Sequence, residues 1–244
     1  MKNPYKILGI ILSVAGAIMA PLFYFFFASV PLTAVALSSI ILGLASFFLA
    51  SARPYISPEA SQILLKAGME NTAALLEEIG IRNKAIYLPA KMRNGYPQAI
   101  IPVKEDCNIK KIRDKLPGRL IVRYGPDADD MAIAVTTPGS INLEMLESPP
   151  GPNAYEIEAA IGYILTGLLD IADGVKVDMT EARVNIDVRN AKMAYEEIWY
   201  YYCLGSPIAS ITAAVSSEAL QKPVRILEEK YHKGKYHITL EVLT

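Results

Sequence analysis

The two histidines are the residues of this chain best suited to metal binding or acid–base chemistry. His232 and His237 flank Lys233-Gly234, a pair that is typical of a tight hairpin turn. Such a hairpin places both imidazoles on one face of the sheet, as diagonal neighbours about 7–8 Å apart. Two histidines can hold a metal ion together with a third ligand, but the sequence identifies no third ligand. We therefore expect no metal and no catalytic residue, and keep His232 and His237 as the candidates for a metal site.

A run of aromatic residues is the second candidate site. In EEIWYYYCLGSP (196–207), a helix would place Trp199 and Tyr202 on one face with Tyr195, while the two tyrosines between them point elsewhere. One core cannot hold every ring, so some reach a ligand pocket, a partner or a membrane interface. The simpler alternative is core packing with one or two tyrosines at the solvent edge. Trp199, Tyr202 and Cys203 are the candidates for lining a pocket for a small apolar ligand.

Two charged segments offer further alternatives. DADD (127–130) gathers three carboxylates that could bind a hard cation, but it lacks the ligand spacing and the glycine of a calcium loop. KEDCNIKKIRDKLPGR (104–119) has six basic and three acidic residues and could contact anionic lipid headgroups. A solvated loop or helix is the simpler interpretation of each. The sequence has no phosphate-binding loop, dinucleotide motif, nucleophile elbow or zinc-protease motif, so we predict a non-enzymatic protein without a cofactor.

The distribution of charge predicts how the chain is anchored. Among its 244 residues, none of the 46 from Ile7 to Ala52 is Asp, Glu, Lys, Arg or His. One membrane crossing needs about 20 residues, whereas 46 would make a helix about 69 Å long. We therefore predict two helices, at about 7–28 and 32–51, with a turn near Pro31. Small residues on both helices would allow close packing, within the hairpin or between copies.

The basic residues around these helices predict their orientation. Lys2 and Lys6 precede the first helix, Arg53 and Lys66 follow the second, and the turn has no basic residue. The positive-inside rule then places the N and C termini in the cytoplasm, and two isolated cysteines agree with a reducing compartment. We predict a two-pass protein of the cell membrane, with the lipid bilayer as its first partner. Because the charges after residue 52 nearly balance, we expect no binding to nucleic acid.

The fold class predicted for the whole chain is α+β. An N-terminal transmembrane helical hairpin (1–55) precedes a cytoplasmic α/β domain with antiparallel strand hairpins and packed helices. The turn-rich segment 137–153 is the expected boundary between a helix and β-hairpin region (56–150) and a second α/β region (151–244).

Hydrophobic periodicity and turn residues locate the elements of this domain. Helices are expected at 57–79, 108–116, 154–173, 191–203 and 207–220. Strand pairs are expected at 84–89 with 97–103, at 119–125 with 131–137, and at 222–230 with 235–243, and the segment 175–188 is expected to form a strand or a hairpin. Asn94-Gly95 predicts the first hairpin turn, and Gly80 and Gly174 are expected to end the two helices that precede them.

The last third of the chain resembles a known family. The segments that carry the likeness are ARVNIDVRN, CLGSPIASITAAVSSEAL and KPVRILEEKYHKGKYHITLEV. From about Gly174 onward their order is similar to that of the 4-vinyl reductase domain family, which is related in fold to small subunits of the vesicle-tethering TRAPP complex. The residues that match the motifs of the family are Gly205, Pro207, Pro223, Val224, Glu228 and Gly234.

The resemblance implies a small α/β domain that binds an apolar or small ligand or a protein partner. Many domains of that family carry several cysteines able to bind a metal, whereas this chain keeps Cys203 and has Ser210 and His237 in the corresponding neighbourhoods. The whole chain also resembles uncharacterised archaeal membrane proteins with two spans.

These observations lead to one functional prediction and two alternatives. We predict a membrane-anchored, non-enzymatic protein with a cytoplasmic binding domain, acting as a scaffold or an accessory subunit of a membrane complex. Contacts with other copies would make it a homo-oligomer. The alternatives are a vinyl-reductase-like sensor that binds a small apolar ligand, and an enzyme with an unrecognised site.

Overall fold

The computed structural model describes residues 4–51, 58–94, 99–104, 107–112, 115–146, 148–193 and 198–243. The chain divides into two compact units, Met1–Leu65 and Lys66–Thr244. Each unit is described by itself.

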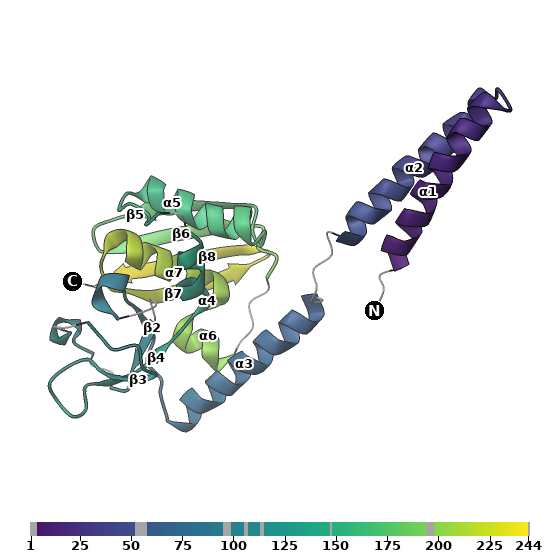
Figure 1. Cartoon of the computed structure of the whole chain (residues 1–244). Helices are drawn as coiled ribbons and strands as arrows, with labels where there is room; N and C mark the ends of the chain where they lie inside the picture. Colours follow the sequence, from purple (N-terminus) through teal and green to yellow (C-terminus); the bar gives the residue numbers. More distant parts are fainter. Residues whose placement is uncertain are drawn as a thin grey trace. The chain divides into compact units, whose positions relative to one another are not determined.

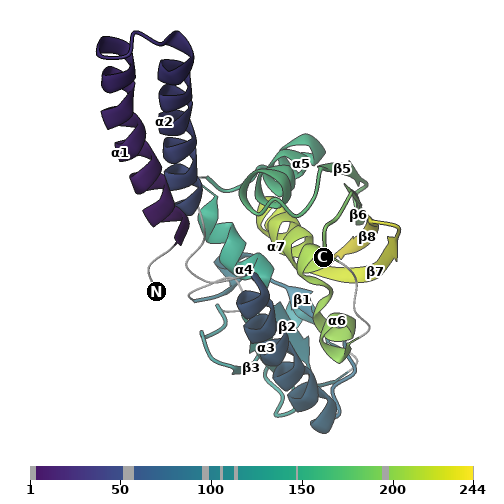
Figure 2. The ribbon, with the colours of Figure 1, turned by 90° about the vertical axis from the view of Figure 1, so that its right-hand side faces the viewer.

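The first unit contains two long apolar helices, α1 (Pro4–Phe25) and α2 (Val30–Ser51), which lie side by side in both ribbon views (Figures 1 and 2). Both are long and apolar enough to cross a membrane, by length and composition. The turn comes slightly earlier than predicted, because α2 already begins at Val30. Pro31 therefore lies in the first turn of the helix, where the missing backbone N–H leaves no hydrogen bond unmade.

Small residues bring the two helices into close contact. Gly9, Gly16, Ala36 and Gly43 are buried although most of their neighbours are exposed. A Cβ atom on Gly9 would lie 2.7 Å from the carbonyl oxygen of Gly43 and 2.8 Å from the nitrogen of Phe47. Packing this tight requires glycine, so the small residues act within the hairpin, which is the first of the two predicted alternatives.

The helix α3 (Pro58–Glu78) leads to the sheet-containing unit. Met69, Ala73 and Leu76 are buried in the main core, which agrees with packing on its own domain. The predicted stop at Gly80 is confirmed, because this residue has φ +76° and Ile81 donates its N–H to the carbonyl oxygen of Leu76. Ser57, the first residue of the helix expected at 57–79, lies outside the described residues.

An eight-stranded sheet forms the centre of the second unit. Its strand order is β3-β4-β2-β1-β7-β8-β6-β5, and all neighbouring strands are antiparallel. The strands are β1 (Ile86–Tyr87), β2 (Ala99–Pro102), β3 (Ile121–Arg123), β4 (Met131–Val135), β5 (Gly174–Met179), β6 (Arg183–Arg189), β7 (Val224–His232) and β8 (Lys235–Val242). The two halves of the sheet meet where β1 pairs with β7, with Ile86 opposite Arg225.

The three predicted strand pairs form, and the segment 175–188, expected as a strand or a hairpin, forms the hairpin of β5 and β6, but several local predictions need correction. The helix expected at 191–203 is one of them, because residues 191–193 are not helical and α6 (Trp199–Leu204) begins at Trp199. Among the described residues of the predicted helix at 108–116, the helical part is one 3-10 turn, η2 (Ile109–Lys111), because Ile112 returns to an extended conformation. The first hairpin has a longer connection than a two-residue turn, since a 3-10 turn, η1 (Ala90–Met92), follows β1. Gly95 of the predicted turn lies outside the described residues.

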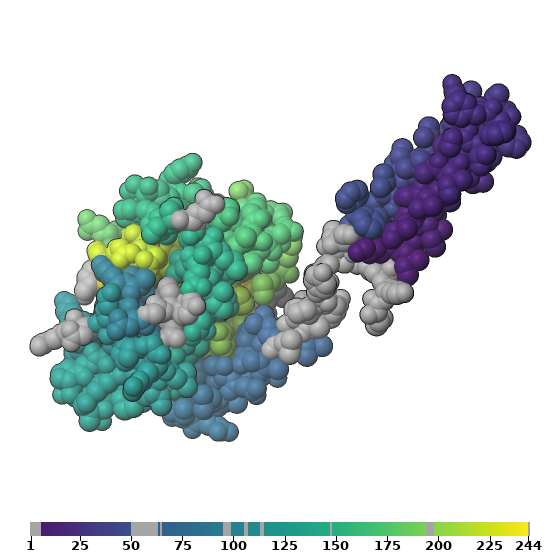
Figure 3. Space-filling view, in the orientation of Figure 1, coloured from purple at the N-terminus to yellow at the C-terminus, as the bar shows by residue number. Residues whose placement is uncertain are grey.

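Helices cover one face of the sheet. They are α4 (Pro138–Asn142), α5 (Ala154–Gly162), α6 (Trp199–Leu204) and α7 (Pro207–Leu220), with a short 3-10 turn, η3 (Leu143–Met145), after α4. The helix α7 is buried along nearly its whole length and packs against β7, β8, α4 and α5. In Figure 3 the yellow of the C-terminal strands is visible only in a small area.

The segment that was expected to separate two regions packs into this layer. At the start of α4, the N–H of Gly139 donates to the hydroxyl of Ser210 on α7, 3.2 Å away. A Cβ atom on Gly139 would lie 2.2 Å from the carbonyl oxygen of Ser210, so the approach requires glycine. Strands from both sides of 137–153 belong to the same sheet.

The helix after this segment starts as predicted and ends early. The capping box of Asn153 and Glu156 is present, and Ile157, Ile161, Ile164 and Leu165 are buried. A π-helical turn, η4 (Tyr163–Leu168), continues α5. The helix ends there, because Asp170 has φ +50°, and Gly174 is already the first residue of β5.

A second hydrophobic cluster covers the opposite face of only one half of the sheet. It consists of Ile86, Leu88, Ile100, Leu116, Val122, Tyr124, Ala132 and Ala134. The strands β1 and β2 and the middle of β4 are therefore buried on both faces, whereas the edge strand β3 exposes Ile121 and Arg123. On the half made of β5 to β8, the side chains that point away from the helices are polar or charged, and we call this surface the open face.

Candidate functional site

A hollow of about 650 Å³ lies on the open face, and we call it the open-face hollow. Its lining residues come from β5, β6, β7, β8 and α5, and they are Glu158, Val175, Lys176, Asp187, Val188, Arg189, Lys230, His232, Lys235, Tyr236 and His237. Four of these side chains are lysine or arginine, and two are aspartate or glutamate. The strand register explains why these residues gather.

One row of the hollow runs straight across four strands. Lys176 on β5 is opposite Asp187 on β6, which is opposite His237 on β8, which in turn is opposite Lys230 on β7. Directly opposite residues have Cβ atoms about 4.5–5.5 Å apart. The row therefore brings two ammonium groups, an imidazole and a carboxylate within reach of one bound molecule.

A second row lies beside the first. Arg189 on β6 is opposite Gly174 on β5, and His232 on β7 is opposite Lys235 on β8. Because Gly174 has no side chain, the Arg189 guanidinium can lie over it: a Cβ atom there would be 3.0 Å from Nη2 of Arg189. The second row adds two permanent cations and an imidazole, and no carboxylate.

Few of these cations are neutralised. The carboxylate of Asp187 accepts from Nδ1 of His237 at 2.7 Å, and the ammonium of Lys230 pairs with Glu228 at 2.7 Å, which lowers the pKa of that carboxyl group. Glu158 accepts the N–H of Val177 at the free edge of β5. Among the described polar residues that line the hollow, the side chains with neither an ion pair nor a hydrogen bond are those of Lys176, Arg189, His232 and Lys235.

The two histidines lie where the hairpin pattern predicts. The turn at Lys233 and Gly234 forms with φ +47° and +78°, and His232 and His237 occupy diagonal positions on one face. Both line the open-face hollow. No three His, Cys, Asp or Glu side chains gather as a metal site would require in the part of the chain that the structure describes. His232 and His237 therefore stay candidates for a metal site, without a third ligand among the described residues.

The aromatic candidates lie elsewhere, on α6. The rings of Trp199 and Tyr202 stack with centroids 4.8 Å apart, and Trp199 Nε1 donates to the carbonyl oxygen of Ile81. Tyr202 is half exposed, whereas Cys203 is buried, which raises the pKa of its thiol to about 11. The two tyrosines between Trp199 and Tyr202 are buried, so this arrangement matches core packing with a tyrosine at the solvent edge. These three candidates do not line the open-face hollow. They also do not line a second hollow, which lies beside Lys111 and Tyr124.

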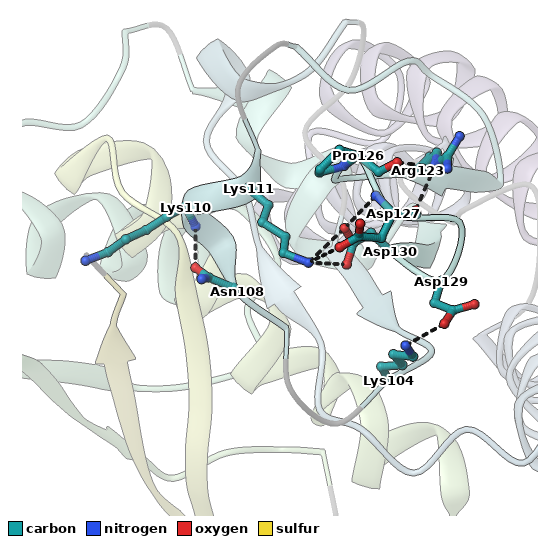
Figure 4. A network of polar contacts seen from close by, with 9 residues as sticks. All are labelled: Lys104, Asn108, Lys110, Lys111, Arg123, Pro126, Asp127, Asp129 and Asp130. Carbon is teal, nitrogen blue, oxygen red and sulfur yellow. Dashed lines mark hydrogen bonds and ion pairs between the residues drawn. The ribbon is translucent and has the colours of Figure 1, made fainter.

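The acidic DADD segment is already paired with lysines (Figure 4). The ammonium of Lys111 is 2.8 Å from a carboxylate oxygen of Asp127 and 2.9 Å from one of Asp130, and Lys104 is 2.6 Å from Asp129. These hydrogen bonds raise the pKa of Lys111 and lower that of Asp130. An ammonium group thus occupies the position that a metal cation would need. The same pairs engage two of the basic residues of segment 104–119.

The sequence analysis did not identify the cations of the hollow. Lys176, Arg189, Lys230 and Lys235 belong to four strands, from two parts of the chain some 40 residues apart. The alternation of charged residues along each strand indicates an exposed face. The order of the strands, which brings β6 beside β8, cannot be read from that alternation.

One comparison with known proteins identifies the family of the chain. Residues 3–242 match the family model described as Domain of unknown function (DUF7982). The chain belongs to the DUF7982 family. The match covers both the helical hairpin and the sheet-containing unit, so the two units occur together in the DUF7982 pattern. No curated protein and no solved structure matches the chain.

Proposed function

We propose that this DUF7982 protein is a two-pass membrane protein that holds a non-enzymatic binding domain at the cytoplasmic side of the cell membrane. The observation that carries the proposal is the surface of the hairpin. Only 11% of each candidate span is buried, and large apolar side chains cover the outside of both helices. Soluble proteins rarely expose so continuous an apolar surface, whereas a lipid bilayer solvates it.

Binding, rather than catalysis, agrees best with the positions of the perturbed groups. Burial raises the pKa values of Tyr87 on β1, Cys203 on α6 and Glu229 on β7, and none of these residues lines the open-face hollow. Burial also raises the pKa of Tyr236, which does line the hollow, but its hydroxyl donates to the carbonyl oxygen of Met193. The hollow instead presents unpaired, solvent-exposed cations, which suit recognition of a partner or ligand. The domain would act as a scaffold or accessory subunit of a membrane complex.

Extraction and cysteine labelling test the membrane topology. We expect the protein to stay in the membrane pellet in alkaline carbonate and to be released by detergent. In a Cys107→Ser background, a membrane-impermeant maleimide should label Phe27→Cys, in the turn between α1 and α2, on intact cells. The matched variant Ser148→Cys, at an exposed position of the sheet-containing unit, should be labelled only after the cells are opened. Release by carbonate, or labelling of Ser148→Cys on intact cells, would contradict the proposal.

The scaffold role has its own test. Native mass spectrometry of the detergent-extracted protein reports the copy number and any partner subunit in one spectrum. We expect an oligomer or a complex with another membrane protein, and a bare monomer at every protein concentration would contradict this part of the proposal. The alternative, a sensor with an apolar ligand beside Trp199 and Tyr202, predicts a retained small molecule in the same spectrum.

A further inference from the structure

We propose that the open-face hollow binds the phosphate groups of a phosphorylated small molecule or lipid headgroup, an inference that rests on the proposed binding function. The two rows described above place Lys176, Arg189, Lys230 and Lys235 around one hollow. Against these four permanent positive charges, the lining supplies only the carboxylates of Asp187 and Glu158.

The state of each charged group favours an anionic ligand. Asp187 is engaged by His237, and the oxygen of Glu158 that accepts from Val177 is engaged by the backbone. Lys176, Arg189 and Lys235 have no such partner among the described residues. Like charges on neighbouring strands repel one another, and a bound anion would convert that repulsion into attraction.

The chemistry of the cations favours phosphate over a single carboxylate. The planar fork of Arg189 matches two oxygens of a phosphate, and the lysine ammonium groups bind phosphate as point charges. Cations on four adjacent strands can engage a ligand with more than one negative charge. The volume of about 650 Å³ also exceeds what one simple ion fills, because a water molecule takes about 30 Å³.

The contrast with the acidic loop supports the choice of this surface. Lys104 and Lys111 lie within 3 Å of carboxylates of the same chain and are unavailable to an external anion. In the open-face hollow, Lys230 pairs with Glu228, whereas Lys176, Arg189 and Lys235 have no such partner among the described residues. A phosphate-bearing ligand would supply to the hollow the negative charge that the aspartates of the acidic loop supply to Lys104 and Lys111.

The test is calorimetric titration of inorganic pyrophosphate into the full-length protein, purified in detergent. The variant Arg189→Gln/Lys235→Gln removes two cations, and we expect its affinity to fall about tenfold or more, since a charge-assisted hydrogen bond contributes about 1.5–3 kcal/mol. The control Lys91→Gln/Lys222→Gln removes two exposed cations outside the hollow and should bind as the wild type does.

A third variant is expected to gain affinity for pyrophosphate, a result that damage to the fold cannot produce. Asp187→Asn removes a negative charge from the hollow, and we expect it to bind pyrophosphate more tightly than the wild type. The guanidinium unfolding curve of each variant, followed by the fluorescence of the single tryptophan, Trp199, shows that the domain is folded.

Nanodiscs distinguish the two sources of phosphate. In discs of phosphatidylcholine, pyrophosphate should bind as it does in detergent. If lipid headgroups are the ligand, adding phosphatidylglycerol to the discs will lower the apparent affinity by competition; equal affinity in both discs identifies a soluble phosphorylated molecule. No binding of pyrophosphate to the folded protein, or equal binding by the Arg189→Gln/Lys235→Gln variant, would overturn the inference. Either result leaves the membrane topology, which is tested by labelling, untouched.

Discussion

The two halves of the sheet differ in what lies on the face opposite the helices. On β1 to β4 that face is buried by Ile86, Ile100 and their neighbours beneath the connecting segments. On β5 to β8 the same face is exposed and carries the open-face hollow. Apart from the edge strand β3, both halves contribute their other face to the main core. The two halves of one sheet therefore have different tasks. The half with β1 to β4 buries a second hydrophobic core, which adds stability, and the half with β5 to β8 exposes charged side chains that can bind a ligand.

The largest expected effect is in the half with β1 to β4. Ile100→Ala removes a fully buried side chain from the second cluster, and truncations of this kind cost about 2–5 kcal/mol of unfolding free energy. Guanidinium unfolding of the full chain in detergent, followed by Trp199 fluorescence, measures the loss. A loss below about 1 kcal/mol would show that the second cluster is not a packed core, and the comparison between the halves would fail.

A smaller effect is expected from the lysine that neutralises the acidic loop. Lys111→Met leaves Asp127 and the buried Asp130 without their ammonium partner and should lower the unfolding midpoint at neutral pH. Because Lys111 lowers the folded-state pKa of Asp130, its contribution is present above the unfolded value of about 3.9 and is lost as the pH falls through the folded value. The difference from wild type should therefore vanish in acid.

The neighbouring lysine provides the control for this prediction. Lys110 points away from the three aspartates (Figure 4), so Lys110→Met should unfold as the wild type does at every pH. A midpoint that changes equally in both variants would mean that the Lys111 pairs do not stabilise the loop.

Two consecutive glutamates of β7, Glu228 and Glu229, point to opposite faces of the sheet, so they allow the open face and the helix-covered face to be compared within one strand. Glu229 points to the helix-covered side, accepts the N–H of Ser206 with one oxygen, and has its other oxygen buried without a described partner. Burial raises its pKa, so the folded state disfavours the charged form above the folded-state value, and this penalty disappears below the unfolded value of about 4.3. Glu229→Gln should therefore add about 1 kcal/mol at neutral pH, and nothing near pH 4.

Glu228, on the open face, should respond in the opposite direction. Lys230 lowers the pKa of this exposed carboxyl group, so Glu228→Gln should slightly reduce stability at neutral pH and have no effect in acid. Urea unfolding across this pH range measures both variants. If the two substitutions shift the midpoint in the same direction, the two sides of β7 are not as different as the structure indicates.

The smallest effect on stability is expected on the open face. Lys176→Ala removes an exposed, unpaired cation and should change the unfolding free energy by less than about 0.5 kcal/mol. The same variant should weaken pyrophosphate binding. A loss of stability as large as that of Ile100→Ala would show that Lys176 stabilises the fold as much as a buried core residue does, and would contradict the comparison.

Much of the fold could be predicted because local rules act on short segments. The uncharged run predicts two apolar helices, alternation and turn residues predict three strand pairs and a strand or hairpin at 175–188, and Gly80 ends α3 with a positive φ. The errors are also local. The stretch 108–116 is charged like an exposed helix but its described residues form only η2, and the helix predicted to reach Gly174 ends at Leu168.

The candidate site could be predicted only in part. Hairpin geometry placed His232 and His237 together, because the turn at Lys233 and Gly234 sets their register. The pairing of β6 with β8 depends on tertiary packing, so Arg189 and Lys176 could not be assigned to the same hollow. The stacking of Trp199 on Tyr202 likewise follows from how α6 lies on the core. Membrane insertion, orientation, the vinyl-reductase likeness and the partners stay predictions.

The pairing of β1 with β7 has a consequence for the biosynthesis of the chain. One edge of β1 pairs with β2 early, but its other edge finds its partners only when Arg225 and Val224 have been made, which at about 5–20 residues per second takes the ribosome roughly 7–30 s. During that interval β1 remains an unsatisfied apolar edge on an incomplete sheet. A translation product that stops anywhere before Val224 keeps that edge permanently, and we expect cellular proteases to remove it while they spare the finished polypeptide.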